Sequence, residues 1–312
     1  MLEMLSTIVL IGVLFYLIGR SADVVIANFK SLGVNLGIQQ FWLGLVLGLL
    51  TSTPEIMVGT QALLQGVPQL SFGNLMGGIV VLLGLIAGVS VVVDREVDLS
   101  WGFRHHELII LTAYISLPLW LGLDGSLGSL DGLALMVGYA MVVAYMIRVN
   151  HRPHPEIRVE PGTSNLQSIW RAMLGLLAVM ILAKLILMFA LPLASRFAVP
   201  PLLLGLLVFS LGTNMPELTL AFRSWREGSR DLSFGNLIGS AFTNPLILGV
   251  FSFFQPVTLV VGVPYVVLTA IILLLLLSFT WFAYTNQRLT WREGWALLGL
   301  YLAFLGFELW WH

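Results

Sequence analysis

Long runs of apolar residues, separated by short polar stretches, fill most of the chain. A helix needs about 20 residues to cross the hydrocarbon core of a bilayer. The runs are continuously apolar and do not alternate with polar residues, so they predict transmembrane helices and not the strands of a barrel. We predict ten spans, at residues 4–19, 36–64, 70–93, 105–122, 130–148, 168–191, 199–222, 232–254, 262–284 and 294–311.

Two of these spans, the second and the seventh, are interrupted by polar residues in the same order. Residues 50–55 read LTSTPE, and residues 212–217 read GTNMPE. A second matching pair follows, LSFGNLMG at residues 70–77 and LSFGNLIG at residues 232–239. The same offset of 162 positions relates both pairs, with no gap inside either copy. A constant offset of this kind predicts an internal repeat.

The repeat divides the chain into two halves of five spans each. We predict a first half at residues 1–150, a linker at residues 151–167 and a second half at residues 168–312. The linker is rich in charged residues and holds three prolines, which is typical of a connecting segment.

The distribution of Lys and Arg predicts the orientation. With the N-terminus outside, 13 of the 15 basic residues fall on the inner side, Arg20 and Lys30 among them. The positive-inside rule favours this arrangement, with both termini outside and residues 149–167 inside. The span of Glu55 then runs outward and that of Glu217 runs inward. Inverted halves with broken helices at matching positions are typical of secondary transporters whose site lies at the midplane.

Composition agrees with a multi-pass membrane protein, which we expect in the plasma (inner) membrane. The chain is 58% hydrophobic and 10% charged, with a mean hydropathy of +0.95, whereas a soluble domain carries about 25% charged residues. A net charge of −1 without a basic tract argues against nucleic-acid binding. The absence of cysteine excludes disulfides and thiolate metal sites. The first apolar run lacks a basic start and a clear cleavage site, so we expect a retained helix.

The repeated motif gathers oxygen atoms inside an apolar segment. A proline removes a backbone donor, so Pro54 and Pro216 are expected to free carbonyls in the preceding turn. The side-chain oxygens at the two breaks come from Thr51, Ser52, Thr213, Asn214, Glu55 and Glu217. Hard cations such as Ca²⁺ take about six to eight oxygen ligands. Two facing carboxylates in a poorly hydrated pocket repel each other and must be neutralised by a cation or by protons, which is the physical basis of exchange.

Several polar residues admit a plainer interpretation beside a functional one. Asn74 and Asn236 follow glycines at the start of the next spans, where they could face the ion, bond the broken backbone or serve packing alone. A glutamate within a span can also be a structural hydrogen-bonding residue. Asp23 is interpreted as an interfacial residue or a partner of Arg20. Lys184, inside the sixth span, is expected to snorkel or to pair internally.

These motifs resemble the sodium/calcium exchanger family of the cation/calcium exchanger superfamily, over essentially the whole chain. The resemblance implies ten helices in two inverted repeats and alternating access, in which the first and sixth spans slide against a core. It implies that Glu55 and Glu217 bind the cations. The further ligands implied by the resemblance are Thr51, Ser52, Thr213, Ser240 and Asn244.

The chain departs from the family pattern at four positions. Leu50 replaces a glycine, and Asn214 replaces a serine. In the third span, Gly78 stands where the family has serine and Leu82 where it has asparagine. The first repeat therefore loses two side-chain oxygens, and we predict a depleted site that holds fewer Na⁺ ions or uses protons for part of the exchange.

The preferred hypothesis is an antiporter that exchanges Ca²⁺ for Na⁺. The alternatives are a proton-coupled cation exchanger and a degenerate family member that does not transport. An intramembrane enzyme using Glu55 and Glu217 as an acid/base pair is disfavoured, since the sequence supplies no nucleophile, phosphate-binding loop or histidine cluster for it. We expect no cofactor. The expected partners are inorganic cations and the lipid bilayer, and we expect the monomer to function.

Overall fold

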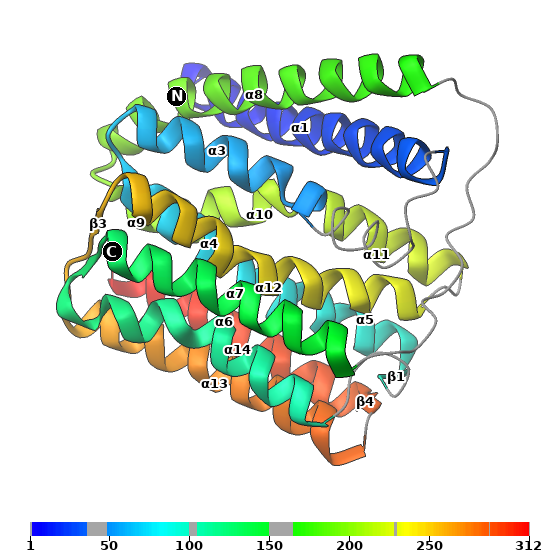
Figure 1. Ribbon diagram of the computed structural model, residues 1–312. Coiled ribbons are helices and arrows are strands. Elements are labelled where there is room, and N and C mark those ends of the chain that lie inside the picture. Colours follow the sequence, from blue (N-terminus) through cyan, green and yellow to red (C-terminus); the bar gives the residue numbers. More distant parts are fainter. Residues whose placement is uncertain are drawn as a thin grey trace.

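The computed structural model describes residues 2–35, 49–99, 105–149, 165–227, 230–286 and 288–311, and in these residues the protein is a bundle of helices with four very short strands (Figure 1). The helices are α1 (Leu2–Asn35), α3 (Thr53–Leu64), α4 (Pro68–Val80), α5 (Ala87–Asp94), α6 (His105–Leu121), α7 (Ser129–Val149), α8 (Asn165–Arg196), α9 (Pro201–Leu204), α10 (Ser210–Thr213), α11 (Met215–Glu227), α12 (Arg230–Phe254), α13 (Val263–Asn286) and α14 (Trp291–Trp311).

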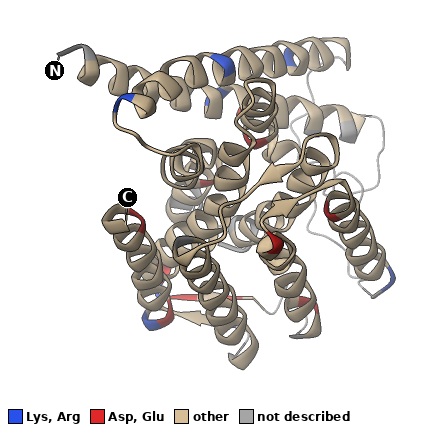
Figure 2. Cartoon of the chain, turned by 90° about the vertical axis from the view of Figure 1, so that its left-hand side faces the viewer, with Lys and Arg blue, Asp and Glu red and all other residues tan. Residues whose placement is uncertain are grey.

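The helical membrane fold is confirmed. Within the described residues, eight helices are long and apolar enough to cross a bilayer, and a bent helix pair, 201–213 with 215–222, could form a ninth span. The predicted second span starts at residue 36, and its residues 36–48 lie outside the described residues. The count of ten therefore stays a prediction. Seen from the end near both termini, few of the described positions are charged (Figure 2).

The predicted end of the first span is wrong. We expected the span to stop at residue 19 and Arg20 to lie in a loop, but α1 continues to Asn35. The reason is tertiary packing: Ala22 and Val25 are completely buried, and a Cβ added to Gly175 in α8 would lie only 2.8 Å from Val25. The candidate membrane span, Met4–Phe29, therefore contains Arg20.

Helices α1 and α8 form a layer of their own. Figure 1 shows them side by side along one face of the bundle, and they make extensive contact with each other. Most of their buried apolar residues, Ile18 and Ile186 among them, belong to one hydrophobic cluster, to which α3, α4, α9 and η3 add a few residues. Helices α5, α6, α7, α12, α13 and α14 contribute to a second, larger cluster. The α1/α8 pair is thus packed separately from most of the bundle.

Helix α4, which carries residues 70–77, crosses in direct backbone contact the helical segment that leads to the second break. Helix α4 continues through a π-helical segment, η1 (Val81–Ile86), and α9 continues through another, η3 (Gly205–Phe209). A Cβ on Gly73 would lie 2.2 Å from the carbonyl oxygen of Leu202, and a Cβ on Gly205 would lie 2.3 Å from that of Leu70. Only glycine fits at such a crossing, which holds the two motifs together.

Strands from distant parts of the chain pair at opposite ends of the bundle. β1 (Glu96–Asp98) pairs with β4 (Arg288–Thr290), and β2 (Ser126–Leu127) pairs with β3 (Val257–Thr258), both antiparallel. Figure 1 shows β1 and β4 at one end and β3 at the other, the end nearer both termini. Each pair ties a connection of the first part of the chain to one of the last part.

The glycine crossing generates a stability prediction. We expect Gly205→Ala to lower the free energy of unfolding by about 1–3 kcal/mol, because the added methyl group must push against the backbone of α4. Thermal unfolding of the purified protein in detergent measures the change. Gly12→Ala is the control, since no described atom lies within 4 Å of its Cβ position. Equal effects of the two substitutions would contradict the proposed contact.

Candidate cation-binding site

The two motifs break their helices in the same way. Ser52 precedes α3 with φ −82° and ψ 14°, and Asn214 precedes α11 with φ −86° and ψ 14°. Each break is followed by a proline and then by a glutamate in the first turn. The first turn of a helix presents unpaired backbone donors and a partial positive charge, which helps to stabilise a carboxylate there.

The backbone around each break differs from the prediction in one respect. We expected the prolines to free the carbonyl groups before them, but the amide of Ile56 donates to the Ser52 carbonyl and the amide of Leu218 donates to the Asn214 carbonyl, both at 3.0 Å. The hydroxyl of Thr53 donates to the Leu50 carbonyl. The reason is that each helix resumes immediately after its break. The carbonyls of Leu50, Ser52 and Asn214 thus already accept hydrogen bonds.

Both carboxylates are buried and lie in one polar cluster. Glu55 is 3% exposed and Glu217 is 2% exposed, and the two groups interact electrostatically. The Ser240 hydroxyl donates to Oε1 of Glu217 at 3.1 Å, and the Thr51 hydroxyl oxygen lies 3.4 Å from that of Ser240. Thr213, from the other break, interacts with Glu55. Glu55 is thus linked directly to the other break, and Glu217 is linked to Thr51 through Ser240.

One oxygen of each carboxylate remains for a ligand. Oε2 of Glu55 and Oε2 of Glu217 are buried and accept no hydrogen bond from the described residues. Burying an ionised oxygen without a partner is costly, so such an atom calls for a cation or a proton. Among the described residues no group of three or more His, Cys, Asp and Glu comes together, so hydroxyl and amide oxygens would have to complete a cation shell.

Amide side chains line the remainder of the cluster. The Thr213 hydroxyl donates to Oδ1 of Asn74 at 3.1 Å. Nδ2 of Asn214 donates to the Ser210 carbonyl at 2.8 Å, and Nδ2 of Asn244 donates to the Leu75 carbonyl at 2.9 Å. All five polar side chains of this part of the cluster are buried: Asn74, Ser210, Thr213, Asn214 and Asn244.

Three predicted residues take a lesser part. Ser52 is buried at the break, and no hydrogen bond of its hydroxyl is described. Gly78 is buried and borders the amides of Asn214 and Asn244. Asn236 is half-buried, and in the described part of the chain no hydrogen bond connects it to the cluster.

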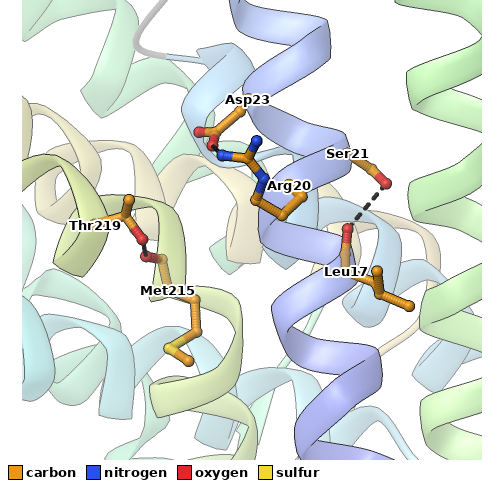
Figure 3. A network of polar contacts seen from close by, with 6 residues as sticks. All are labelled: Leu17, Arg20, Ser21, Asp23, Met215 and Thr219. Atoms are coloured by element: carbon orange, nitrogen blue, oxygen red, sulfur yellow. Dashed lines mark hydrogen bonds and ion pairs between the residues drawn. The ribbon is translucent and has the colours of Figure 1, made fainter.

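Sequence reasoning missed the proximity of α1 to the second motif. A Cβ on Gly19 would lie 3.5 Å from Cβ of Met215. Arg20 and Asp23 form the expected ion pair, at 3.5 Å, and Figure 3 shows both on the side of α1 that faces Met215 and Thr219. Asp23 also interacts electrostatically with Glu217. The signal in the sequence was the charged pair Arg20 and Asp23 next to Gly19, but the predicted end of the first span placed Arg20 in a loop.

The model of the family described as sodium/calcium exchanger protein matches residues 6–148 and 167–310. The chain belongs to this family. Members of the sodium/calcium exchanger family are transporters, so the ions they carry are substrates and not cofactors. The chain is accordingly a multi-pass membrane protein of an antiporter family.

Individual relatives agree with the family assignment. CaxA of Alkalimonas amylolytica, which is named as a putative antiporter, is 29% identical over 96% of this chain and 98% of its own length. The sodium/calcium exchanger MaX1 of Methanosarcina acetivorans is 24% identical over 96% of each chain.

Solved structures show the same fold. The crystal structure of the H⁺/Ca²⁺ exchanger CAX superposes with a TM-score of 0.79 at 18% identity, covering 97% of this chain and 81% of the other. A structure of the sodium-calcium exchanger NCX_Mj superposes with a TM-score of 0.66 at 20% identity, covering 96% of this chain and 98% of the other.

The hydrogen bond between Ser240 and Glu217 generates a binding prediction. We expect Ser240→Ala to weaken cation binding about tenfold, because the bond helps to hold the carboxylate in place and a hydrogen bond to a charged group contributes about 1.5–3 kcal/mol. Thr243→Ala is the matched control, since this buried hydroxyl of the same helix donates to the Gly239 carbonyl instead. Equilibrium ⁴⁵Ca²⁺ binding measures both variants, and equal losses would argue against a role of Ser240 at the site.

Proposed function

We propose that the protein is a secondary-active antiporter that exchanges Ca²⁺ for Na⁺ by alternating access. The observation that carries the proposal is the buried pair Glu55 and Glu217, one from each helix break, with Thr213 beside the first and Ser240 bonded to the second. Two carboxylates match the charge of one divalent cation. Because the pair is buried, it is stable only when neutralised, so one cation leaves as others or protons replace it.

The proposed ligands come from both halves of the chain. They are Glu55, Glu217, Thr51, Ser52, Thr213, Asn214, Ser240 and Asn244, with Asn74, Asn236 and Gly78 as neighbours that shape the pocket. We propose that the set is lopsided, since Ser240 and Asn244 are matched in the first repeat by Gly78 and by the fully buried Leu82, which carry no side-chain oxygen.

We further propose that the two halves are inverted repeats of five spans, residues 1–150 and 168–312, joined by an inner linker at residues 151–167. Matched segments at opposite ends of the bundle support this arrangement. The 162-residue offset carries β1 onto residues 258–260, which overlap β3, and β1 and β3 lie at opposite ends (Figure 1). The family match in two segments of similar length is also consistent with two halves.

We propose that α1 and α8 move together against the rest of the bundle. The extensive contact between α1 and α8 supports this division, and the hydrophobic cluster that they share with residues of α3, α4, α9 and η3 is distinct from the larger one. At the second break α1 packs closely on the motif, because a Cβ on Gly212 would lie 2.2 Å from the ring of Phe15, and Gly19 lies directly against Met215. Movement of α1 would thus expose or cover the motif of Glu217. One chain supplies both carboxylates, so we propose that the monomer functions. We also propose that the protein lies in the inner membrane with both termini outside.

Proton-coupled Ca²⁺ exchange is the second candidate. The missing oxygens at Gly78 and Leu82 favour it, because Na⁺ needs a shell of oxygen ligands whereas a proton needs only a carboxylate.

Flux measurements in proteoliposomes test the proposal. We expect an outward Na⁺ gradient to drive ⁴⁵Ca²⁺ uptake, and Glu55→Gln or Glu217→Gln to reduce uptake at least about tenfold, because each removes a charge that binds the cation. Glu308→Gln is the matched control, since Glu308 is a buried acid of α14.

The driving gradient distinguishes the candidates. Uptake driven by a pH gradient and indifferent to Na⁺ would replace the first candidate by the second. The absence of uptake under either gradient would overturn both and would indicate a family member that does not transport.

A further inference from the structure

Two pairs of repeat-matched positions exchange small and large residues. The 162-residue offset matches Gly78 with Ser240, and it matches Ser52 with Asn214. One side of the site therefore has serine from both repeats, Ser52 and Ser240. The matching residues, Gly78 and Asn214, form the other side. A loss of volume at one position accompanies a gain at the other.

Gly78 and Asn214 meet in the structure, together with Asn244. A Cβ added to Gly78 would lie 3.2 Å from Nδ2 of Asn214 and 3.0 Å from Nδ2 of Asn244. Both distances are shorter than ordinary van der Waals contact, so any side chain on residue 78 would press on both amides. The amide of the larger Asn214 thus occupies space that the absent side chain at residue 78 leaves open.

The orientation of both amides is fixed by backbone carbonyls. Nδ2 of Asn214 donates to the Ser210 carbonyl and Nδ2 of Asn244 to the Leu75 carbonyl. A carbonyl accepts a hydrogen bond only from the nitrogen of an amide side chain, so the nitrogen and oxygen cannot be exchanged. Leu75 lies one turn before Gly78 in α4, where the missing side chain leaves its carbonyl accessible to Asn244.

We propose that Gly78, Asn214 and Asn244, the amide patch, exclude a second cation from the Gly78 side of the site, because the two amides turn their Nδ2 atoms to that side. Asn214 and Asn244 then have only their Oδ1 atoms to offer as ligands to the cation on the side of Ser240. The chemistry differs between the two sides: amide N–H donors surround Gly78, whereas hydroxyl and carboxylate oxygens meet at Thr51, Ser240 and Glu217. A cation is attracted by oxygen and repelled by the positive end of an N–H group.

The amide patch therefore acts as a specificity determinant. It makes the site a single-cation site and lowers its capacity for additional Na⁺. This inference rests on the proposed function, because it concerns the cations that the same carboxylates bind.

A double-mutant cycle of Gly78→Ser and Asn214→Ser tests the size coupling. We expect Gly78→Ser alone to weaken ⁴⁵Ca²⁺ binding about tenfold, and the double variant to recover to within about threefold of the wild type, because the smaller side chain at position 214 relieves the contact. Gly84→Ala is the matched control, since its Cβ would meet Tyr301 at 3.1 Å, away from the amides. Additive losses in the double variant would overturn the coupling.

Competition by Na⁺ tests specificity separately from packing. We expect the double variant to need about threefold less Na⁺ to displace half of the bound Ca²⁺, because hydroxyl oxygens replace an amide beside residue 78. An unchanged Na⁺ requirement in a variant that has recovered Ca²⁺ binding would reduce the amide patch to a packing feature and overturn the proposal.

Failure of the proposed function would be recognised independently. Thermal unfolding of the four proteins in cation-free detergent reports the size coupling whether or not the protein transports. A coupled stability cycle with no Ca²⁺ binding by the wild type would contradict the antiporter and, with it, the cation specificity. A stability cycle without coupling, in a protein that does bind Ca²⁺, would overturn the amide patch alone.

Discussion

The neutralisation of two buried carboxylates is the constraint on which the structure depends. Glu55 and Glu217 are nearly inaccessible, and each has an oxygen without a hydrogen bond from the described residues. In a medium of low polarity, like charges cannot remain ionised at close range without a counter-charge. The broken helices and the polar side chains beside them meet this constraint with first-turn dipoles and hydroxyl donors. The fold brings the two breaks together by a glycine-lined crossing of α4 with η3.

The location of the site was largely predictable from the sequence. A carboxylate that follows a proline within an apolar run is rare, and its repetition at a constant offset pointed to both glutamates. The same stretches pointed to the hydroxyls of Thr51 and Thr213, whereas Ser240 was implied only by the family resemblance. The structure brings all three hydroxyls to the carboxylates. Local composition sufficed here because a polar group inside a membrane span needs a reason.

Features that depend on distant contacts were not predictable. The first helix extends past Arg20 because Ala22 and Val25 are buried and α8 packs closely on them at Gly175, and nothing near residue 20 announces that partner. The fit of Asn214 against Gly78 likewise depends on a crossing between the two halves. A propensity or motif describes one stretch of chain, whereas these features arise from pairs of stretches far apart in sequence.

The two strand pairs have a consequence for biosynthesis. β1 ends at Asp98, yet its partner β4 begins only at Arg288, so its ladder cannot close until nearly the entire polypeptide has left the ribosome. Contacts of such long sequence separation form late, because the intervening chain must first be ordered. Early intermediates in the membrane would therefore present the exposed edge of β1. The pairing of β1 with β4 would mark the last stage of maturation, when the end of α5 becomes joined to the connection between α13 and α14.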